Sequence, residues 1–449
     1  MTRGKEGSSL DSFATAVISL ILIIAALFII YKVVRGVYCV LCLVLRVLFQ
    51  QKFHIFFLLL ATVPLLLQNF GPPYFEFDSY SVEPALPLEG PLSINDALNE
   101  GEKLFKGQIK GPESLVAHKG ILYAGLATGE IIAVQDDNWW VVADLLQPCR
   151  GAWDLDNCGR PLGLAFDKEG FLWVADAYYG IYKVDVKSKK QAYKLVVPTN
   201  KKIKTNESLE EYPLLPNSIT IGTDGSLYWS DSSTNVPLHN LVVSVLGDKS
   251  GRLIKTNPKT GESTVLMSGL RFANGVLLAP DESYILVAET FLFRVHRYWL
   301  KGPNKGKSEV FIDRLPGAPD NLSPTEDGGF IINLIQPRSA ALDTLAAWKS
   351  VRRFIAAVLC LADLMFQKID ERYPNDFNKN MMASIGHYSS IAPFMARHSI
   401  AVFCDKNGKI LKSLHARGDI AAVSDVVTLN GYHYLGSPHN DFLGRVRVR

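Results

Sequence analysis

A pair of short strands joined by a tight turn recurs along the chain from about residue 111 onward. Each copy has an apolar strand, a turn with Asp, Asn or Gly, and a second strand rich in β-branched and aromatic residues. Three copies read GLAFDKEGFLWVAD, SITIGTDGSLYWSD and GVLLAPDESYILVAE. The turn positions Gly170, Gly225, Glu282 and Gly328 follow one another at spacings of 55, 57 and 46 residues. Such a period points to a repeat architecture.

The repeat predicts an all-β fold, a six-bladed β-propeller. After each hairpin comes a further strand pair, and four strands per period of this length describe a propeller blade. Counting the turns at Lys119-Gly120 and Gly431 with the four above gives six blades. We therefore expect a propeller over residues 111–449, preceded by a linker and the start of the propeller over 71–110. A two-sheet β-sandwich is the alternative, but it does not explain the regular period.

The fifth repeat contains extra residues, because Gly431 follows Gly328 by 103 residues. Within roughly 337–398, apolar residues such as Leu345, Trp348 and Leu361 are spaced mostly at threes and fours. This spacing gives one apolar face of a helix. We expect a helical insertion in the fifth blade, which either packs on the propeller, covers the central channel or lies on a membrane.

Residues 1–70 are predicted to form a membrane anchor. Residues 13–31 contain no charge, a length sufficient to cross a bilayer, and 53–70 form a second apolar block of similar length. A cleaved signal peptide is less favoured, because the apolar core is too long and no small-residue cleavage site follows. One, two or three crossings all remain open.

The charges between the two blocks predict the side on which the propeller lies. All are basic: Lys32, Arg35, Arg46 and Lys52. The positive-inside rule places them in the cytoplasm, and the propeller then lies on the extracellular side of the plasma membrane or in the lumen of the endoplasmic reticulum. Cys149 and Cys158, nine residues apart, suit a disulfide there, although buried free thiols are the alternative. Asn206 begins a glycosylation sequon. The net charge of +3 predicts no nucleic-acid partner.

Oxygen-bearing side chains recur at one register of the repeat. Asn217, Asn274 and Asp320 each precede their turn by eight residues, and Glu113 precedes its turn by seven. Leu162 is the apolar exception. Since the first strand of each blade lines the central channel, residues just before it converge at one mouth. Each Asn alone is explained by turn formation, but the shared register favours a metal site.

A hard cation suits this set. Ca²⁺ takes six to eight oxygens from carboxylates, amide carbonyls and waters, and Asn321 adds a further amide. A bound Ca²⁺ polarises a carbonyl oxygen and lowers the pKa of a bound water, which predicts a hydrolase of small esters or lactones. Asp320 and Asp425 are the catalytic candidates; Asp176, His387, His398 and His433 are other possible bases.

Whole phrases of the chain also resemble one known family. CGRPLGLAF, FLWVADAYYGIYKVD, LRFANGVLLAPDESYILVAET and PGAPDN are similar to segments of the strictosidine synthase-like propellers, and the resemblance extends from about Glu83 to Arg449. It implies an N-terminal membrane segment and a propeller outside the cytosol. More distantly the chain resembles the paraoxonases and related Ca²⁺ propeller esterases. That likeness implies Ca²⁺ ligands at Glu113, Asn217, Asn274, Asp320 and Asn321.

The resemblance leaves three functions to be weighed. The first is a membrane-anchored, Ca²⁺-dependent hydrolase of the arylesterase type, which acts on small esters or lactones. The second is a non-catalytic surface propeller for adhesion or reception, with a structural Ca²⁺. The third is strictosidine synthase-type condensation, for which the family's catalytic Glu corresponds to the shorter Asp425. One further departure is Ser218, where the family usually has Asp after the first Asn.

Overall fold

The strands of the protein form six sheets within the part of the chain that the structure describes. The structure is a computed structural model that describes residues 29–40, 72–147, 149–151, 153–188, 192–204, 210–387 and 396–448. The first sheet contains β2 (Leu115–His118), β3 (Ile121–Gly125), β4 (Glu130–Gln135) and β5 (Asn138–Asp144). The second contains β6 (Pro161–Phe166), β7 (Leu172–Asp176), β8 (Gly180–Asp185) and β9 (Ala192–Pro198).

The third sheet is longer than the others. It contains β12 (Pro216–Ile221), β13 (Leu227–Asp231), β14 (Gly251–Asn257) and β15 (Glu262–Leu270), extended by β10 (Ile203–Lys204) and β11 (Glu210–Glu211). The fourth contains β16 (Ala273–Leu278), β17 (Tyr284–Glu289), β18 (Arg294–Trp299) and β19 (Ser308–Ile312). The fifth contains β20 (Gly317–Pro324), β21 (Phe330–Pro337), β22 (His398–Cys404) and β23 (Ile410–Arg417).

The sixth sheet joins the two ends of the propeller. It contains β24 (Asp425–Leu429), β25 (Tyr432–Gly436), β26 (Leu443–Arg447) and, from the other end of the chain, β1 (Glu102–Leu104). β1 pairs antiparallel with β26, so that Lys103 lies opposite Gly444. Pairing the first strand with the last closes the ring by backbone hydrogen bonds and leaves no gap between the first and sixth sheets.

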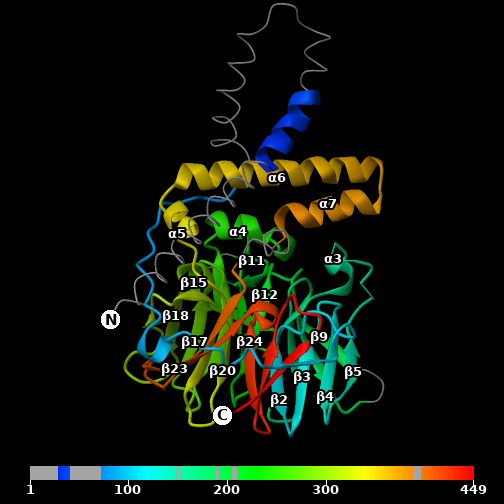
Figure 1. Ribbon diagram of the computed structural model, residues 1–449. Helices are drawn as coiled ribbons and strands as arrows, with labels where there is room; N and C mark the ends of the chain where they lie inside the picture. The colour runs from blue at the N-terminus through cyan, green and yellow to red at the C-terminus, as the bar shows by residue number, and fades with distance from the viewer. Residues whose placement is uncertain are drawn as a thin grey trace, which may run out of the picture.

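The first strands of successive sheets form a closed ring. β2 contacts β6, and contacts continue through β12, β16, β20 and β24 back to β2. A ring of six antiparallel sheets confirms the all-β prediction and is consistent with a six-bladed propeller (Figure 1). Each sheet is therefore called a blade below and numbered in chain order.

The hydrophobic core lies between the blades. One apolar cluster joins Leu286 of the fourth blade to Ile332 of the fifth, and a comparable cluster joins Leu115 of the first blade to Leu443 of the sixth. The second strands have neighbours on both faces, and every residue of β7, β13 and β17 is buried. This is why these strands read as continuous apolar runs rather than as alternating ones.

Helices cover one end of the propeller. The described helices are α3 (Leu155–Cys158), α4 (Leu241–Gly247), α5 (Ala340–Ala346), α6 (Lys349–Arg372), α7 (Asp376–Gly386) and an unlabelled helix over residues 29–40. Short 3-10 turns are η1 (Gly90–Leu92), η2 (Leu238–Asn240), η3 (Thr290–Leu292) and η5 (Gly418–Ile420). α5, α6 and α7 lie between β21 and β22, and with α4 they form a layer above the propeller that we call the helical cap (Figure 1).

The predicted membrane anchor falls mainly on residues outside the described ranges. Of the blocks 13–31 and 53–70, only residues 29–31 are described, as the start of helix 29–40. Among the described residues, we find no helix with the length and apolar character needed to span a bilayer.

Candidate functional site

The first strands of blades three, four and five are irregular at the end that faces the helical cap. In each of them the pairing with the second strand is interrupted by a β-bulge near the start of the strand. Bulges bend a strand and redirect side chains, and they are common beside active sites. The interrupted positions contain Asn217 in β12, Asn274 in β16, and Asp320 with Asn321 in β20.

Glycines let these irregular strands approach one another closely. A Cβ atom at Gly163 would lie 2.5 Å from the carbonyl oxygen of Asn217, and one at Gly275 would lie 2.4 Å from that of Asp320. No side chain fits at these distances, because they are shorter than van der Waals contact. The two glycines therefore allow neighbouring first strands to bring their polar residues together at the axis.

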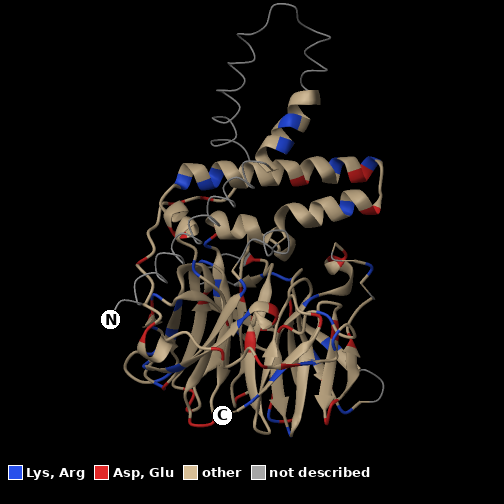
Figure 2. Ribbon diagram, in the orientation of Figure 1, with Lys and Arg blue, Asp and Glu red and all other residues tan. Residues whose placement is uncertain are grey.

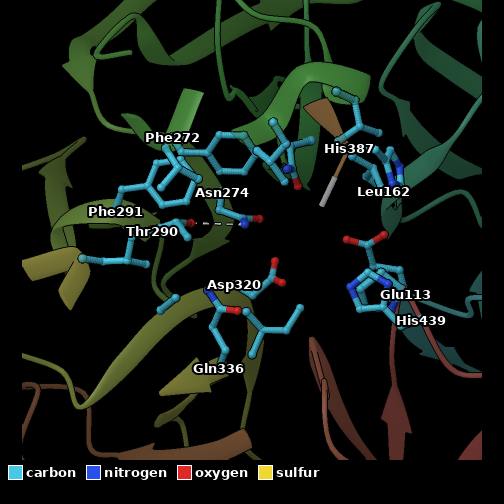
Figure 3. Close-up of a pocket in the computed structure, with 18 of the residues that line it drawn as sticks. Glu113, Leu162, Phe272, Asn274, Thr290, Phe291, Asp320, Gln336, His387 and His439 are labelled. Atoms are coloured by element: carbon cyan, nitrogen blue, oxygen red, sulfur yellow. Dashed lines mark hydrogen bonds between the residues drawn. The ribbon is translucent and has the colours of Figure 1, made fainter. Parts of the chain in front are cut away.

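Four of the five predicted metal ligands line one cavity. Glu113, Asn217, Asn274 and Asp320 face a space of about 610 Å³ between the propeller and the helical cap. In Figure 3 the carboxylates of Glu113 and Asp320 and the amide of Asn274 point toward this space from different blades. Asn321 is buried, with 4% exposure, but is not among the described residues that line the cavity.

Asp320 is buried among other acids. Burial raises the pKa of its carboxyl well above the usual range, and the nearby charge of Glu113 raises it further. The amide of Asn274 opposes this shift through a side-chain hydrogen bond, and Asp425 adds a weaker repulsion. A cation beside Asp320 would remove the cost of keeping this carboxylate charged.

Glu113 has a cationic partner that the sequence analysis did not identify. Arg160 donates from Nη2 to Glu113 Oε2 over 2.5 Å and from Nη1 to the carbonyl oxygen of Gly111 over 3.1 Å. Burial raises the pKa of Glu113, while the positive charge of Arg160 opposes that rise. Arg160 therefore occupies one carboxylate oxygen of Glu113, and Oε1 is the oxygen left for another ligand.

Asn274 provides the test of whether a cation fits. Its Nδ2 donates to Thr290 Oγ1 over 3.3 Å, while its Oδ1 is buried and has no hydrogen-bond partner. A buried acceptor left unpaired costs about 1–3 kcal/mol, so its retention calls for an explanation. An amide oxygen beside two carboxylates matches the oxygen ligands that Ca²⁺ prefers. The residues present therefore fit a hard cation.

The donor set depends on amides as well as acids. Among the described residues, no three His, Cys, Asp or Glu side chains lie close enough together to hold a metal ion. On the propeller side of the cavity the carboxylates are Glu113 and Asp320, and the remaining protein oxygens would come from Asn217 and Asn274. The third lining carboxylate, Asp343, belongs to α5 and is paired with Arg338. A soft-metal site is disfavoured because Cys and His ligands do not complete the set.

Asp425 lies in the ring of first strands rather than at the cavity. Its Oδ2 accepts a hydrogen bond from the backbone N–H of Leu115 over 2.9 Å, and its Oδ1 accepts one from Ser323 Oγ over 2.6 Å. Burial raises its pKa to about 7. These bonds tie the sixth blade to the first and fifth, which is a structural position. The structure does not bring Asp425 to the cavity with Asp320.

Two histidines line the cavity near Arg160. Burial and the charge of Arg160 lower the pKa of both His387 and His439 to about 4, so both rings are neutral at pH 7. Figure 3 places His439 beside Glu113 and His387 on the same side of the cavity. The sequence analysis considered His387 but missed His439, which stands in the loop after β25 and outside the register of the repeat.

The other predicted sites are placed as follows. Cys149 and Cys158 form the expected disulfide, with their Cα atoms 5.1 Å apart, and Cys149 lines the cavity. His398 and His433 lie in the outer strand β22 and in β25, away from the cavity lining. Asn206, the predicted glycosylation site, lies outside the described residues.

Comparison with known proteins identifies relatives over most of the chain. The strictosidine synthase family model matches residues 217–303, and the model named strictosidine synthase-like, N-terminal, matches residues 90–134. The adipocyte plasma membrane-associated protein hemomucin of Drosophila melanogaster is 38% identical over 405 residues, which cover 88% of this chain and 68% of that protein. The adipocyte plasma membrane-associated protein of Rattus norvegicus is 30% identical over 396 residues, covering 87% and 96%.

Among solved structures, a gluconolactonase from Xanthomonas campestris has a similar fold. It is 11% identical, with 84% of this chain and 99% of that chain covered and a TM-score of 0.49. A likeness at this level carries no argument about function. The sequence relatives are decisive, because they cover nearly the whole described propeller at 30% identity or more. The chain belongs to the strictosidine synthase-like family, together with hemomucin and adipocyte plasma membrane-associated protein.

Proposed function

We propose that the protein is a membrane-anchored, Ca²⁺-dependent hydrolase of small esters or lactones, of the arylesterase type. The observation that carries this proposal is the cavity where Glu113, Asn217, Asn274 and Asp320 meet and where Asn274 Oδ1 has no partner. Its volume of about 610 Å³ lies in the range of small-molecule sites. Aromatic and aliphatic side chains such as Phe272, Phe291 and Leu241 form the rest of the wall.

The four oxygen-bearing residues would hold Ca²⁺ at the axis, with Asn321 close by. A bound Ca²⁺ supplies a Lewis acid that polarises the substrate carbonyl and lowers the pKa of a bound water. Asp320 would be both a ligand and a candidate base. The neutral ring of His439 would accept a proton from water at one of its nitrogens. Asp425 would act by positioning β2 and β20, because its carboxylate is bonded to both strands.

The proposed location follows from the N-terminal sequence. Residues 1–70 would anchor the chain in the plasma membrane or the endoplasmic reticulum, and the propeller would lie on the extracellular or lumenal side. The disulfide at Cys149 and Cys158 supports an oxidising compartment. The relatives named above are described as plasma membrane-associated. Glycosylation at Asn206 is proposed on the same grounds. The insertion at 337–398 would act as a cover for the cavity.

One observation favours a second candidate function. Glu113, Asn217, Asn274 and Asp320 come from the first, third, fourth and fifth blades, so an ion bound to them would also tie blades together. A surface propeller for adhesion would use such a structural ion without turnover. Condensation of the strictosidine synthase type receives no comparable support, because Asp425 does not line the cavity.

The test is hydrolysis of phenyl acetate by the full chain in detergent, before and after chelation and Ca²⁺ readdition. We expect activity that chelation abolishes and Ca²⁺ restores, and that Asp320→Asn removes. Asp327→Asn, in an exposed turn between β20 and β21, is the matched control and leaves the activity unchanged. Activity that persists in Asp320→Asn with chelator present contradicts the metal mechanism. Heat stability that depends on Ca²⁺ without turnover on a panel of esters supports the adhesion function instead.

A further inference from the structure

The segment that follows the predicted anchor is fixed against α6 of the helical cap. Arg353 donates from Nη1 to the carbonyl oxygen of Pro73 over 3.1 Å, and Arg352 donates from Nη2 to that of Asp78. Phe77 is buried in a cluster with Ala356 of α6. These contacts hold residues 73–78 on the helical cap, so the chain enters the folded part of the protein at α6.

The position of Pro73 limits how far the predicted anchor can be from α6. The second predicted crossing ends at Phe70, three residues before Pro73. Three residues span at most about 11 Å when fully extended. That distance is about the diameter of one helix with its side chains. If residues 53–70 cross the bilayer, the membrane surface must therefore lie next to α6.

The outward face of α6 is apolar. Leu361, Met365 and Ile369, spaced four residues apart, are 37%, 45% and 39% exposed, and Val351 on the same face is 40% exposed. Residues at this spacing form one stripe along a helix. In Figure 2 the middle of α6 is mostly uncharged, and charges gather toward its two ends. Among the described residues, only helix 29–40 lies farther from the propeller than α6 (Figure 1).

Two charged residues of α6 point inward, and the exposed ones, among them the ion pair of Lys368 with Glu371, lie at the two ends of the helix. Arg352 and Asp363 point inward and are only 1% and 6% exposed. Arg352 is bonded there to the carbonyl oxygen of Leu246. Lys368 and Arg372 stand at the C-terminal end of the helix and are exposed. An apolar outer face with basic residues at its edge is typical of a helix that lies in a membrane interface.

Helix 29–40 supports the same side for the membrane. It is the blue helix in Figure 1 and lies on the side of α6 away from the propeller. Its apolar side chains are exposed, with Ile29 at 55%, Val34 at 52% and Val40 at 66%. Exposed apolar side chains from a separate part of the sequence are thus found on the same side of the propeller as α6.

We propose that the outer face of α6, defined by Val351, Leu361, Met365 and Ile369, lies in the surface of the lipid bilayer. The partner is the membrane and not a second copy of the chain, because the short connection from Phe70 to Pro73 fixes α6 next to the predicted crossing. This inference rests on the proposed membrane anchor but not on the proposed hydrolysis.

The docked helical cap also indicates a substrate class. Leu241 and Val245 of α4 and Leu342 and Leu345 of α5 line the cavity from the helical cap, beside the charged Asp343 and Arg352. An apolar wall beneath a membrane-facing helix suits an ester or lactone with a hydrocarbon chain that partitions into lipid. The proposal therefore extends the proposed function to amphiphilic substrates taken up from the bilayer.

The test places an environment-sensitive fluorophore on α6. The full chain carrying Cys39→Ser, Cys42→Ser and Cys360→Ala, which removes the partly exposed thiol of α6, is labelled with NBD at Met365→Cys, and separately at Leu361→Cys. It is reconstituted in vesicles of phosphatidylcholine and phosphatidylserine. Label at Asp327→Cys, in the exposed turn at the other end of the propeller, is the control. We expect blue-shifted emission at 365 and 361 that nitroxide-labelled lipid quenches, and neither effect at 327.

The outcomes distinguish failure of the membrane-docked α6 from failure of the membrane anchor and of the proposed hydrolysis. Flotation with the vesicles but a water-like, unquenched label at both 365 and 361 overturns the membrane-docked α6 and leaves the anchor intact. Failure of the chain to float with vesicles overturns the anchor as well. In the same vesicles, Leu361→Glu with Met365→Glu should slow hydrolysis of a long-chain ester several-fold and leave that of phenyl acetate unchanged. Equal rates on the long-chain ester overturn uptake from lipid.

Discussion

Two sets of buried acids differ in how the chain satisfies them. Asp176, Asp231 and Glu289 end the second strands of the second, third and fourth blades. Each accepts a backbone N–H from the segment that leads into the first strand of its own blade: Arg160 N to Asp176 over 2.7 Å, Leu215 N to Asp231 over 2.8 Å and Arg271 N to Glu289 over 2.8 Å. We call these the framework acids.

In two of the framework acids, the second carboxylate oxygen is bound by basic side chains. Arg252 lies 2.6 Å from Asp231, and Arg294 and His296 both contact the second oxygen of Glu289. The cavity acids, Glu113 and Asp320, are equally buried but less well satisfied. Glu113 shares one arginine, and the charges that most affect Asp320 are those of other acids. The chain thus supplies partners for its structural acids, whereas at the axis only one oxygen of Glu113 is paired with a cation and Asp320 is left to a ligand from outside.

The largest effect on activity is expected from replacing one acid of the cavity. Asp320→Asn removes a proposed Ca²⁺ ligand and an unneutralised buried charge at the same time. We expect Ca²⁺-dependent ester hydrolysis to fall about 100-fold or more, in line with the loss of an electrostatic group at the reacting centre. The free energy of unfolding without Ca²⁺ should stay the same or rise. A large loss of metal-free stability would show that Asp320 is instead a framework acid.

For a framework acid we expect the free energy of unfolding without Ca²⁺ to fall rather than to stay the same or rise. Asp231→Asn removes the buried acid partner of Arg252 and leaves Glu211, 2.7 Å away and half-exposed. Breaking a buried ion pair costs about 3–5 kcal/mol, and the remaining pair with Glu211 reduces this loss. Urea unfolding of the metal-free protein measures this loss. The stabilisation by added Ca²⁺ should be the same as in the unsubstituted chain. If Asp231→Asn is neutral, the distinction between the two sets of acids fails.

A third prediction concerns pH. Burial raises the pKa of Asp425 to about 7 and that of Asp176 to about 6, and it raises that of Asp320 as well. An acid with a raised pKa in the folded state binds more protons there than in the unfolded state. These acids therefore contribute stability to the metal-free protein that is lost as the pH rises from about 4 to about 7, whereas the buried His387 and His439, with pKa values lowered to about 4, contribute stability that is gained over the same range.

Thermal unfolding in the presence of chelator checks this pH dependence. Asp425→Asn should make the stability at pH 7 more favourable relative to that at pH 4 than in the unsubstituted chain, because it removes a buried carboxyl whose pKa is raised to about 7. Added Ca²⁺ should stabilise the protein increasingly over the same window, since protons and the ion compete for the cavity acids. A pH dependence of stability that is the same in Asp425→Asn and in the unsubstituted chain is the contrary result.

The smallest effect is expected at Ser218, the residue after the proposed ligand Asn217. Ser218 Oγ accepts a hydrogen bond from the backbone N–H of Val276 in the next blade over 3.0 Å. Ser218→Ala leaves that buried donor unpaired, which costs about 1–2 kcal/mol. Ca²⁺ affinity should not change, because this hydroxyl is bonded to the strand rather than turned to the cavity. A fall in Ca²⁺ affinity would place Ser218 among the ligands.

The repeat made the blades and the axial register predictable from sequence. The strand turns need positive φ, and Gly170, Gly225 and Gly328 have φ values of 86°, 82° and 80°. Because glycine marks these turns, counting back from them reached Asn217, Asn274 and Asp320. Local signals of this kind do not depend on how the blades are packed.

Other parts of the site depend on contacts between distant segments. Arg160 meets Glu113 from 47 residues away, and His439 lies outside the register, so neither has a local signal. Asp425 matched a family position, but its role depends on Leu115, which is 310 residues away. The β-bulges also escape prediction, because they arise where first strands pack against one another.

Calorimetric titration of the full chain with Ca²⁺ tests the central claim most directly. The account predicts binding of one ion per chain, with an affinity that falls sharply when Asn274→Ala and Asp320→Asn are combined. Asp231→Asn should bind as tightly as the unsubstituted chain. Binding that is absent, or that is unchanged in the double variant, would contradict an ion held where the blades converge.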